Sequence, residues 1–418
     1  MYYLITMKHF KKFSLFFFLI TITHFVSAQN KMESLSISNA VYYELIGRYD
    51  IARLNHIMNV EIPAATGTKE NYTPAKNAVK LYRITYPSVI PEQNNRPTMA
   101  SGLIAIPETA EKHLPVISYQ HGTAMEKDLV PSFPEKSFET RLMIAQFAAQ
   151  GYVVFGADYF GLGLSKEKDG YMVIGSQQQA CIDMYEVTKL ILPKIGITPT
   201  AFFLTGWSQG GVVTMTFLER LERSNTKVTA AATVAAQCDG YVMLNGFMSF
   251  PRKIDGSWVS AMFMLTVFSF EEYYQIPGLA QGFFTPEMYP IAKRVYEKDP
   301  TLKPEEFPTD LKKLIRKEFF DPVYYRNSAY GKIMSELHPY RWVVESPVRM
   351  YYGEIDESLT NGLAQLPSAY QKAMGNNKVE AISLGADANH RIAFARAVPQ
   401  WKKWFDEMLV TPSKSTSK

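Results

Sequence analysis

Hydrophobic and polar residues alternate with a period of two along residues 79–86, and again along residues 100–106. This period is typical of β-strands that bury one face. Pro87 and Pro107 follow the two runs, and proline is disfavoured inside a sheet because it lacks a backbone N–H. We therefore expect two consecutive antiparallel strands that end at these prolines. A helical stretch is expected before them, around residues 38–56.

The pattern then changes to short apolar runs that alternate with helical segments. Strands that are covered on both faces are expected at residues 116–119, 152–157, 201–205, 228–234, 348–352 and 379–384. Helices are expected at residues 138–150, 176–192, 212–221 and 393–409. Gly151 suits the C-cap of the first of these helices, and Ser176 begins a capping box for the second. Alternating strands and helices predict an α/β fold with a mostly parallel central sheet that is flanked by helices.

This alternation is interrupted between residues 239 and 345, which we call the inserted segment. It is rich in Phe, Tyr, Met and Pro. An insertion between late strands of such a sheet lies above their C-terminal ends, where ligands bind. We therefore predict a largely helical cap that lines a ligand pocket, attached to a core made of residues 29–238 and 346–418. The alternative is a helical lobe whose aromatic residues form its own core.

Residues 1–28 have the pattern of an export signal. Three lysines precede an apolar run that starts at residue 13, and small residues end the segment at Ala28. The apolar run is shorter than the roughly 20 residues that a membrane span needs. We predict cleavage before Gln29, no stable membrane span, and an exported protein that is periplasmic or secreted.

Charge and cysteine content narrow the possible functions further. The chain has 44 basic and 40 acidic residues, and loss of the signal leaves 41 and 40. This balance offers no basic surface for nucleic acid, and no basic run suggests binding to lipid headgroups. Cys181 and Cys238 are the two cysteines, and whether they pair is left open. No metal-ligand or cofactor pattern is present, so we expect neither a metal nor a cofactor.

The segment Gly206-Trp207-Ser208-Gln209-Gly210 has the pattern of a nucleophile elbow. An apolar run of strand length precedes it, and a helical run follows. On such a strand-to-helix turn the serine has strained backbone angles and an accessible hydroxyl. Glycine is expected at 206 and 210 because a β-carbon there would collide with the neighbouring strand or helix. Ser208 is therefore the predicted nucleophile.

A serine hydroxyl needs a base to take its proton, and an acid to hold that base in one tautomer. After an elbow the acid and then the histidine follow in the chain. Only His338 and His390 follow Ser208. His390 lies in a polar loop just before the last helix, whereas His338 lies in the inserted segment. The chain order therefore predicts His390 as the base.

The acid is expected after a strand and before His390. Asp356 stands three residues after Gly353, which ends a predicted strand, and is the predicted acid. Asp387 is the competitor, although its position in the histidine's own loop suits local turn capping better. The neighbours of Asp356, at Glu354 and Glu357, are expected to be solvated.

Two backbone donors are needed for the oxyanion of a tetrahedral intermediate. The N–H of Gln209, directly after the nucleophile, is one candidate. The other is the N–H of Thr123, in the sequence Gln120-His121-Gly122-Thr123 after the strand at 116–119. The hydroxyl of Thr123 is a possible third donor. His121 is expected to brace this loop through hydrogen bonds.

Taken together, these residues resemble the α/β-hydrolase superfamily over nearly the whole mature chain, and within it the secreted lipases and esterases with an inserted helical cap. The matching segments are residues 100–107, 119–123, 157–163, 206–211, 353–356 and His390. The resemblance implies hydrolysis of a small-molecule or lipid acyl ester by a serine esterase or lipase, through an acyl-enzyme intermediate and without a cofactor. It departs at Cys238-Asp239, where a Gly-Pro turn is usual.

Two other functions remain open. A serine aminopeptidase or acyltransferase on the same fold would need an acidic group for the substrate amine, and Asp239, Glu271 and Glu272 are candidates. A non-catalytic binding protein is also possible, although such proteins usually lose a triad member. The sequence does not indicate the acyl chain length or the oligomeric state.

Overall fold

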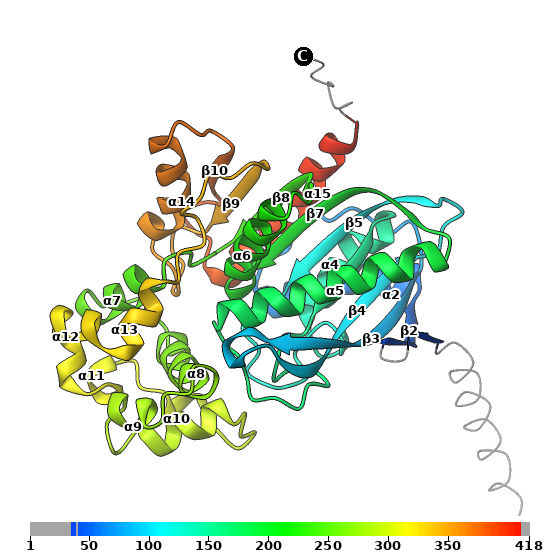
Figure 1. Cartoon of the computed structure of the whole chain (residues 1–418). Helices are drawn as coiled ribbons and strands as arrows, with labels where there is room; N and C mark the ends of the chain where they lie inside the picture. The colour runs from blue at the N-terminus through cyan, green and yellow to red at the C-terminus, as the bar shows by residue number, and fades with distance from the viewer. Residues whose placement is uncertain (1–34, 39–40, 411–418) are drawn as a thin grey trace, which may run out of the picture.

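A ten-stranded sheet forms the centre of the computed structural model, which describes residues 35–38 and 41–410 (Figure 1). The strand order is β1-β2-β3-β4-β6-β5-β7-β8-β9-β10. The pairs from β1 to β6 in this order are antiparallel, and those from β6 to β10 are parallel. The strands are β1 (Leu35–Ser38), β2 (Val41–Tyr49), β3 (Val79–Ile90), β4 (Arg96–Pro107), β5 (His113–Gln120), β6 (Val153–Ala157), β7 (Thr198–Trp207), β8 (Ala230–Val234), β9 (Val348–Tyr352) and β10 (Val379–Ser383).

Helices cover both faces of this sheet. On one face α5 (Ile174–Lys194) and α6 (Gln209–Arg223) lie side by side, while α4 (Phe138–Gln146) and α15 (His390–Val410) lie behind it (Figure 1). α14 (Asn361–Ala373) packs against β9 and β10. Every residue of β6 and β8 is buried, which explains their continuous apolar character. The predicted α/β architecture is confirmed.

Shorter helical turns connect these elements. They are α2 (Ile51–His56), the π-helical turn η1 (Ile57–Glu61), α3 (Ile62–Thr66), and the 3₁₀ turns η2 (Pro91–Gln93) and η3 (Ala148–Gln150). The predicted C-cap at Gly151 is confirmed, with a left-handed φ of 98°.

The two predicted antiparallel strands form β3 and β4, with Val79 opposite Pro107. The prediction that Pro87 ends β3 was wrong, because the strand continues to Ile90. The last β3 residue that pairs with β2 is Thr85, so Pro87 lies beyond that pairing and is bonded to β4 alone. Proline is tolerated there because its missing N–H leaves no ladder bond unmade.

The predicted helix over residues 38–56 was wrong for most of its length. Residues 41–49 form β2, and the helix begins only after Asp50, whose carboxylate accepts a hydrogen bond from the N–H of Arg53 at 2.7 Å. In β2 the side chains of Val41 and Tyr43 are buried, whereas Tyr42 and Glu44 are exposed. This alternation is the strand signal that the helical prediction overlooked.

The predicted capping box at Ser176 was also wrong. α5 begins two residues earlier, at Ile174, so Ser176 lies within its first turn. The N–H and hydroxyl of Ser176 both donate to the carboxylate of Glu92, which lies between β3 and β4. A carboxylate from a distant loop therefore takes the place of a local cap at this helix N-terminus.

The inserted segment contains helices and one isolated β-bridge, between Phe284 and Ile315, and forms a lobe beside the sheet (Figure 1). Its elements are α7 (Gly240–Ser249), α8 (Trp258–Tyr273), α9 (Leu279–Phe283), α10 (Tyr289–Tyr296), η4 (Pro304–Glu306), α11 (Leu311–Leu314), η5 (Lys317–Phe320), α12 (Pro322–Asn327) and α13 (Ala329–Ser335). Many of its aromatic rings pack on one another, as Phe283 does on Phe263 and Tyr330. Most of the aromatic residues therefore form the lobe's own core, and the domain boundaries stay a prediction.

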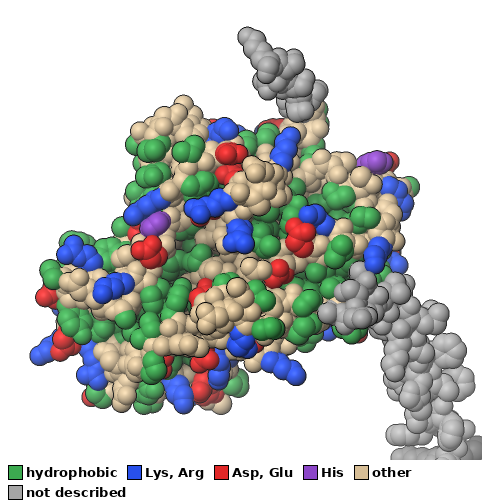
Figure 2. Space-filling view, in the orientation of Figure 1, with side chains coloured by type: hydrophobic (Ala, Val, Ile, Leu, Met, Phe, Trp, Pro, Cys, Tyr) green, Lys and Arg blue, Asp and Glu red, His purple; other side chains and the backbone are tan. Residues whose placement is uncertain are grey.

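Positive and negative side chains are interspersed over the face of the molecule that Figure 2 shows. Within the described residues, no helix has both the length and the apolar character needed to cross a membrane. Cys181 and Cys238 are buried and unpaired, so the question of their pairing is answered by two free thiols. The predicted signal at residues 1–28 lies outside the described residues.

Candidate active site

Ser208 lies on the turn between β7 and α6, with φ 57° and ψ −123°. Few residues with a side chain adopt a positive φ, and such strain is common at functional sites. A β-carbon at Gly206 would overlap the carbonyl oxygen of Gly210, and one at Gly210 would overlap that of Gln120. Both elbow glycines therefore have the packing role that the sequence predicted.

Asp356 and His390 are brought together from the loop after β9 and the first residue of α15. The Nδ1 of His390 lies 2.8 Å from Oδ2 of Asp356, and the Asp356 side chain is fully buried. The N–H of Ser358 donates to the other carboxylate oxygen at 2.7 Å. Burial lowers the pKa of His390, but the negative charge of Asp356 and its hydrogen bond outweigh burial and raise this pKa above its ordinary value.

The competing residues have other partners. The carboxylate of Asp387 is exposed and pairs with Arg396 at 2.7 Å. His338 lines a different cavity, together with residues of α5 and α6. Glu354 is exposed, as predicted, but Glu357 is only half-exposed and accepts a hydrogen bond from the backbone N–H of His390 at 3.1 Å. The prediction that Glu357 is a solvated neighbour was therefore wrong.

Ser208 and His390 line the same cavity, which has a volume of about 170 Å³ and which we call the site cavity. Its apolar wall includes side chains from the core and from α8. These are Met125, Leu129, Phe138, Trp207, Trp258, Ala261 and Met262. The charged residues that line it are Lys136, Glu139, Glu357 and Arg391. The inserted segment thus contributes to the wall of the cavity that contains the predicted nucleophile and base.

Residues 121–124, the His-Gly loop, follow β5, and Thr123 also lines the site cavity. The Nδ1 of His121 lies 2.7 Å from the carbonyl oxygen of Gly122, and its Nε2 lies 3.0 Å from that of Asp158. In a trans peptide the C=O and N–H point in opposite directions, so this contact turns the Thr123 N–H away from His121. His121 therefore braces the loop as predicted.

The predicted oxyanion donors have free backbone N–H groups. In residues 35–38 and 41–410, neither the N–H of Thr123 nor that of Gln209 donates to an acceptor of the chain. The hydroxyl of Thr123, a possible third donor, instead donates to Tyr171 at 3.2 Å.

The sequence analysis missed Glu139, which lies in the first turn of α4 and lines the site cavity. Its carboxylate accepts hydrogen bonds from the N–H of Gly122, at 2.8 Å, and from the hydroxyl of Tyr119. Burial raises the pKa of this carboxyl group. No local pattern could have marked Glu139, because its contacts depend on how α4 packs beside the loop after β5.

Within residues 35–38 and 41–410, no group of three or more His, Cys, Asp or Glu side chains is arranged to hold a metal ion. The expectation that neither a metal nor a cofactor takes part stays a prediction.

Comparison with known proteins supports the same fold. Residues 130–265 match a family described as serine aminopeptidase, S33. A search of curated proteins found no match. A candidate hydrolase from Legionella pneumophila is 19% identical, with a TM-score of 0.79 over 91% of this chain and 99% of that one.

Two further solved structures share the fold at lower identity. The rice cell wall degrading esterase LipA from Xanthomonas oryzae is 17% identical, with a TM-score of 0.69 over 90% of this chain and 95% of that one. Lipase A from Candida antarctica is 14% identical, with a TM-score of 0.58 over 83% and 77% of the two chains. With its mostly parallel sheet, elbow and flanking helices, the chain has the α/β-hydrolase fold.

Proposed function

We propose that the protein is a serine hydrolase that cleaves carboxylic esters, with Ser208 as nucleophile, His390 as base and Asp356 as the acid that orients the base. The observation that carries this proposal is the contact of 2.8 Å between His390 and the buried Asp356, beside a cavity that His390 shares with Ser208. A base held in one tautomer that lines the same cavity as a strained serine is an arrangement that can activate the hydroxyl.

The reaction would proceed in two halves. Ser208 Oγ attacks the acyl carbon while His390 Nε2 takes its proton, and the imidazolium keeps its Nδ1–H on Asp356. The N–H groups of Gln209 and Thr123 would hold the negative oxygen. His390 then gives its proton to the departing alcohol, which leaves an acyl group on Ser208. Water, deprotonated by His390, attacks this acyl-enzyme and releases the acid and the free serine.

The walls of the site cavity favour an acyl ester as substrate. Aromatic and methionine side chains form an adaptable apolar surface, which suits an acyl chain. Two solved relatives of the same fold are named as an esterase and a lipase. We therefore propose a small-molecule or lipid acyl ester.

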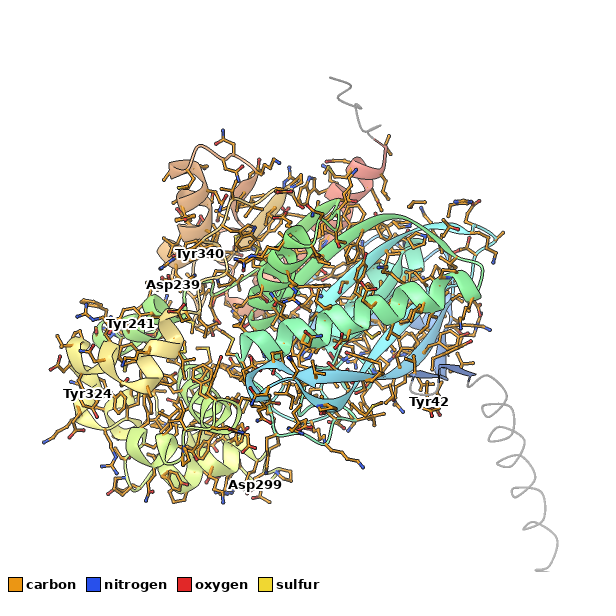
Figure 3. The ribbon with its side chains drawn as sticks, viewed as in Figure 1. Tyr42, Asp239, Tyr241, Asp299, Tyr324 and Tyr340 are labelled. Carbon is orange, nitrogen blue, oxygen red and sulfur yellow. The ribbon has the colours of Figure 1, made fainter. Side chains whose placement is uncertain are left out.

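A serine aminopeptidase is the second candidate, because the matching family carries that description and two carboxylates, Glu139 and Glu357, line the cavity. The acidic residues that the sequence analysis named for binding the substrate amine lie elsewhere. Asp239 accepts hydrogen bonds from Tyr340 at 2.8 Å and Arg341 at 3.0 Å, and it lies near Tyr340 in Figure 3. Among the described residues that line the site cavity, neither Glu271 nor Glu272 is present.

A panel of p-nitrophenyl esters and aminoacyl p-nitroanilides separates these functions. Ester turnover should greatly exceed anilide turnover, and Ser208→Ala should abolish it without loss of stability, because removal of one hydroxyl leaves no large cavity. An alkyl phosphonate should form an adduct at Ser208, detectable by peptide mass spectrometry. A folded Ser208→Ala variant with wild-type kcat would contradict the proposed nucleophile, and preferential anilide cleavage would support the aminopeptidase.

Export is part of the same proposal, based on the pattern of residues 1–28. Expression of the full chain in a bacterial host should give a mature protein that begins at Gln29 and is found outside the cytoplasm. Its intact mass and N-terminal sequence would test this, and an uncleaved chain in the cytoplasm would contradict it.

A further inference from the structure

Lys298 connects the inserted segment to the His-Gly loop. Its Nζ donates to the carbonyl oxygen of Ala124 at 2.6 Å and pairs with Asp169 Oδ2 at the same distance. The two charged side chains are largely buried, with 12% of Lys298 and 6% of Asp169 exposed. Ala124 follows Thr123 directly. A buried ammonium group of the inserted segment therefore contacts the loop that carries the proposed oxyanion donor.

Two features accompany this contact, the backbone conformation of Lys298 and the hydrogen bonds of its partner Asp169. Lys298 has φ 59°, a left-handed backbone conformation that few residues with a side chain adopt. Its partner Asp169 is fixed by two helices of the inserted segment, because its backbone carbonyl accepts hydrogen bonds from Ser269 of α8, at 2.8 Å, and Tyr296 of α10, at 2.9 Å. The pair is therefore part of the seam between the inserted segment and the core.

The other side of the His-Gly loop is anchored by the core. The N–H of Gly122 donates to Glu139 at 2.8 Å, and the C=O of Gly122 lies 2.7 Å from His121 Nδ1. Thr123 thus lies between one residue that the core holds and another, Ala124, that Lys298 holds. Among the described residues, Lys298 does not line the site cavity, so it has no direct access to a substrate there.

We infer that Lys298 is a positioning residue for the reaction: it holds the His-Gly loop so that the Thr123 N–H faces the oxyanion, and it makes this donor depend on the docked inserted segment. The inference rests on the proposed serine hydrolase function. An oxyanion donor acts mainly on the transition state, so loss of its alignment lowers kcat and leaves KM nearly unchanged.

The test compares Lys298→Met with the double variant Lys298→Met/Asp169→Asn. The single variant leaves the buried Asp169 without a partner, whereas the double variant removes both charges. Lys293→Met is the matched control, because Lys293 is an exposed lysine of α10 that pairs only loosely with Glu297, at 3.6 Å. Loss of a whole oxyanion donor costs about 10²–10³ in kcat, so loss of its positioning should cost about tenfold or more.

For a p-nitrophenyl ester we expect kcat to fall about tenfold or more in both Lys298 variants, with KM within about twofold of wild type. Affinity for phenylboronic acid, which forms a tetrahedral adduct on a nucleophilic serine, should fall in parallel, and Lys293→Met should match wild type. Recovery of kcat in the double variant would overturn the inference, because it would assign the loss to the unpaired Asp169. If the single variant does not fold, the double variant alone decides.

Ser208→Ala distinguishes failure of this inference from failure of the proposed function. An inactive Ser208→Ala together with wild-type kcat in the Lys298 variants would overturn only the role of Lys298. An active Ser208→Ala would overturn the serine mechanism itself.

Discussion

The two candidate acids for His390 are Asp356 and Asp387, and their side chains have different partners. Asp356 is buried against His390, whereas Asp387 is exposed against Arg396. Asparagine at 356 could not stabilise the imidazolium or hold the same tautomer, so Asp356→Asn should lower kcat by roughly a thousandfold or more. Asp387→Asn is the matched control and should stay near wild type. Steady-state kinetics on both variants would check this, and the opposite ranking would assign the acid role to Asp387.

The acid limb of the pH profile tests the environment of His390. Burial lowers its pKa, but Asp356 outweighs burial, and Glu357 and Glu139 add to the increase. Only the neutral imidazole can take the serine proton, so kcat/KM should fall as the pH decreases through a midpoint above about 6.5, the ordinary histidine value.

Variants of the neighbouring carboxylates test the direction in which each one shifts the pKa of His390. Asp356→Asn removes the attraction that favours the imidazolium, so the midpoint should move to lower pH, and Glu357→Gln should move it less in the same direction. The midpoint can be measured from the rate of phosphonate inactivation where turnover is slow. A wild-type midpoint below 6.5, or an upward shift in Asp356→Asn, would contradict this account.

Residues with a local signature were predictable, and residues defined by tertiary contacts were not. Ser208 and its two glycines were recognisable because a strand-to-helix turn imposes its own residue types over a few positions. Glu139 and Lys298 carry no such signature. Gly122 lies outside α4, 17 residues before Glu139, and Ala124 lies 174 residues before Lys298, so only the packing of α4 and of the inserted segment brings these partners together.

Among the described elements of the inserted segment, α8 places side chains in the site cavity, through Trp258, Ala261 and Met262. Met262→Ala enlarges the cavity and should move the preferred acyl chain to greater length, whereas Ala261→Phe fills it and should shorten that preference. Each buried methylene is worth about 0.8 kcal/mol, or roughly fourfold in kcat/KM. A series of p-nitrophenyl esters of increasing chain length would measure the optimum.

Ala373→Phe is the control for the phenyl ring added in Ala261→Phe, because Ala373 lies at an exposed position of α14. It should leave the optimum unchanged, and none of the three variants should alter the acid limb of the pH profile. An optimum that stays fixed in both α8 variants would mean that the core loops alone set the chain length, and that the inserted segment is a structural lobe.

The predictions of helices and strands were wrong where residues distant in the sequence decide the local conformation. Residues 41–49 were predicted to be helical, but they form β2, because they pair along the edge of β3. The start of α5 was misplaced because Glu92, rather than a local side chain, satisfies its first turn. β6 and β8 were predicted correctly, since a fully buried strand leaves a continuous apolar run in the sequence.

At the scale of the whole molecule, the sheet order explains how residues 208, 356 and 390 come to the same edge of the sheet. β7, β8, β9 and β10 are consecutive parallel neighbours, so the loops that follow them open on the same edge of the sheet. The chain order of serine, acid and histidine therefore becomes a spatial order. The alternation of strands and helices predicted this parallel arrangement, whereas the position of β6 between β4 and β5 has no signature in the hydrophobic pattern.

The two thiols provide a measure of the integrity of this core. Cys181 lies in α5 and Cys238 follows β8, and burial raises the pKa of both. A thiol reacts as its thiolate, so both groups should be almost inert toward Ellman's reagent in the native protein and should react together when the core unfolds. Labelling should follow the urea transition seen by circular dichroism, and a reductant should leave Tm unchanged. Rapid labelling without urea would contradict the buried positions, and a Tm lowered by reductant would show a disulfide.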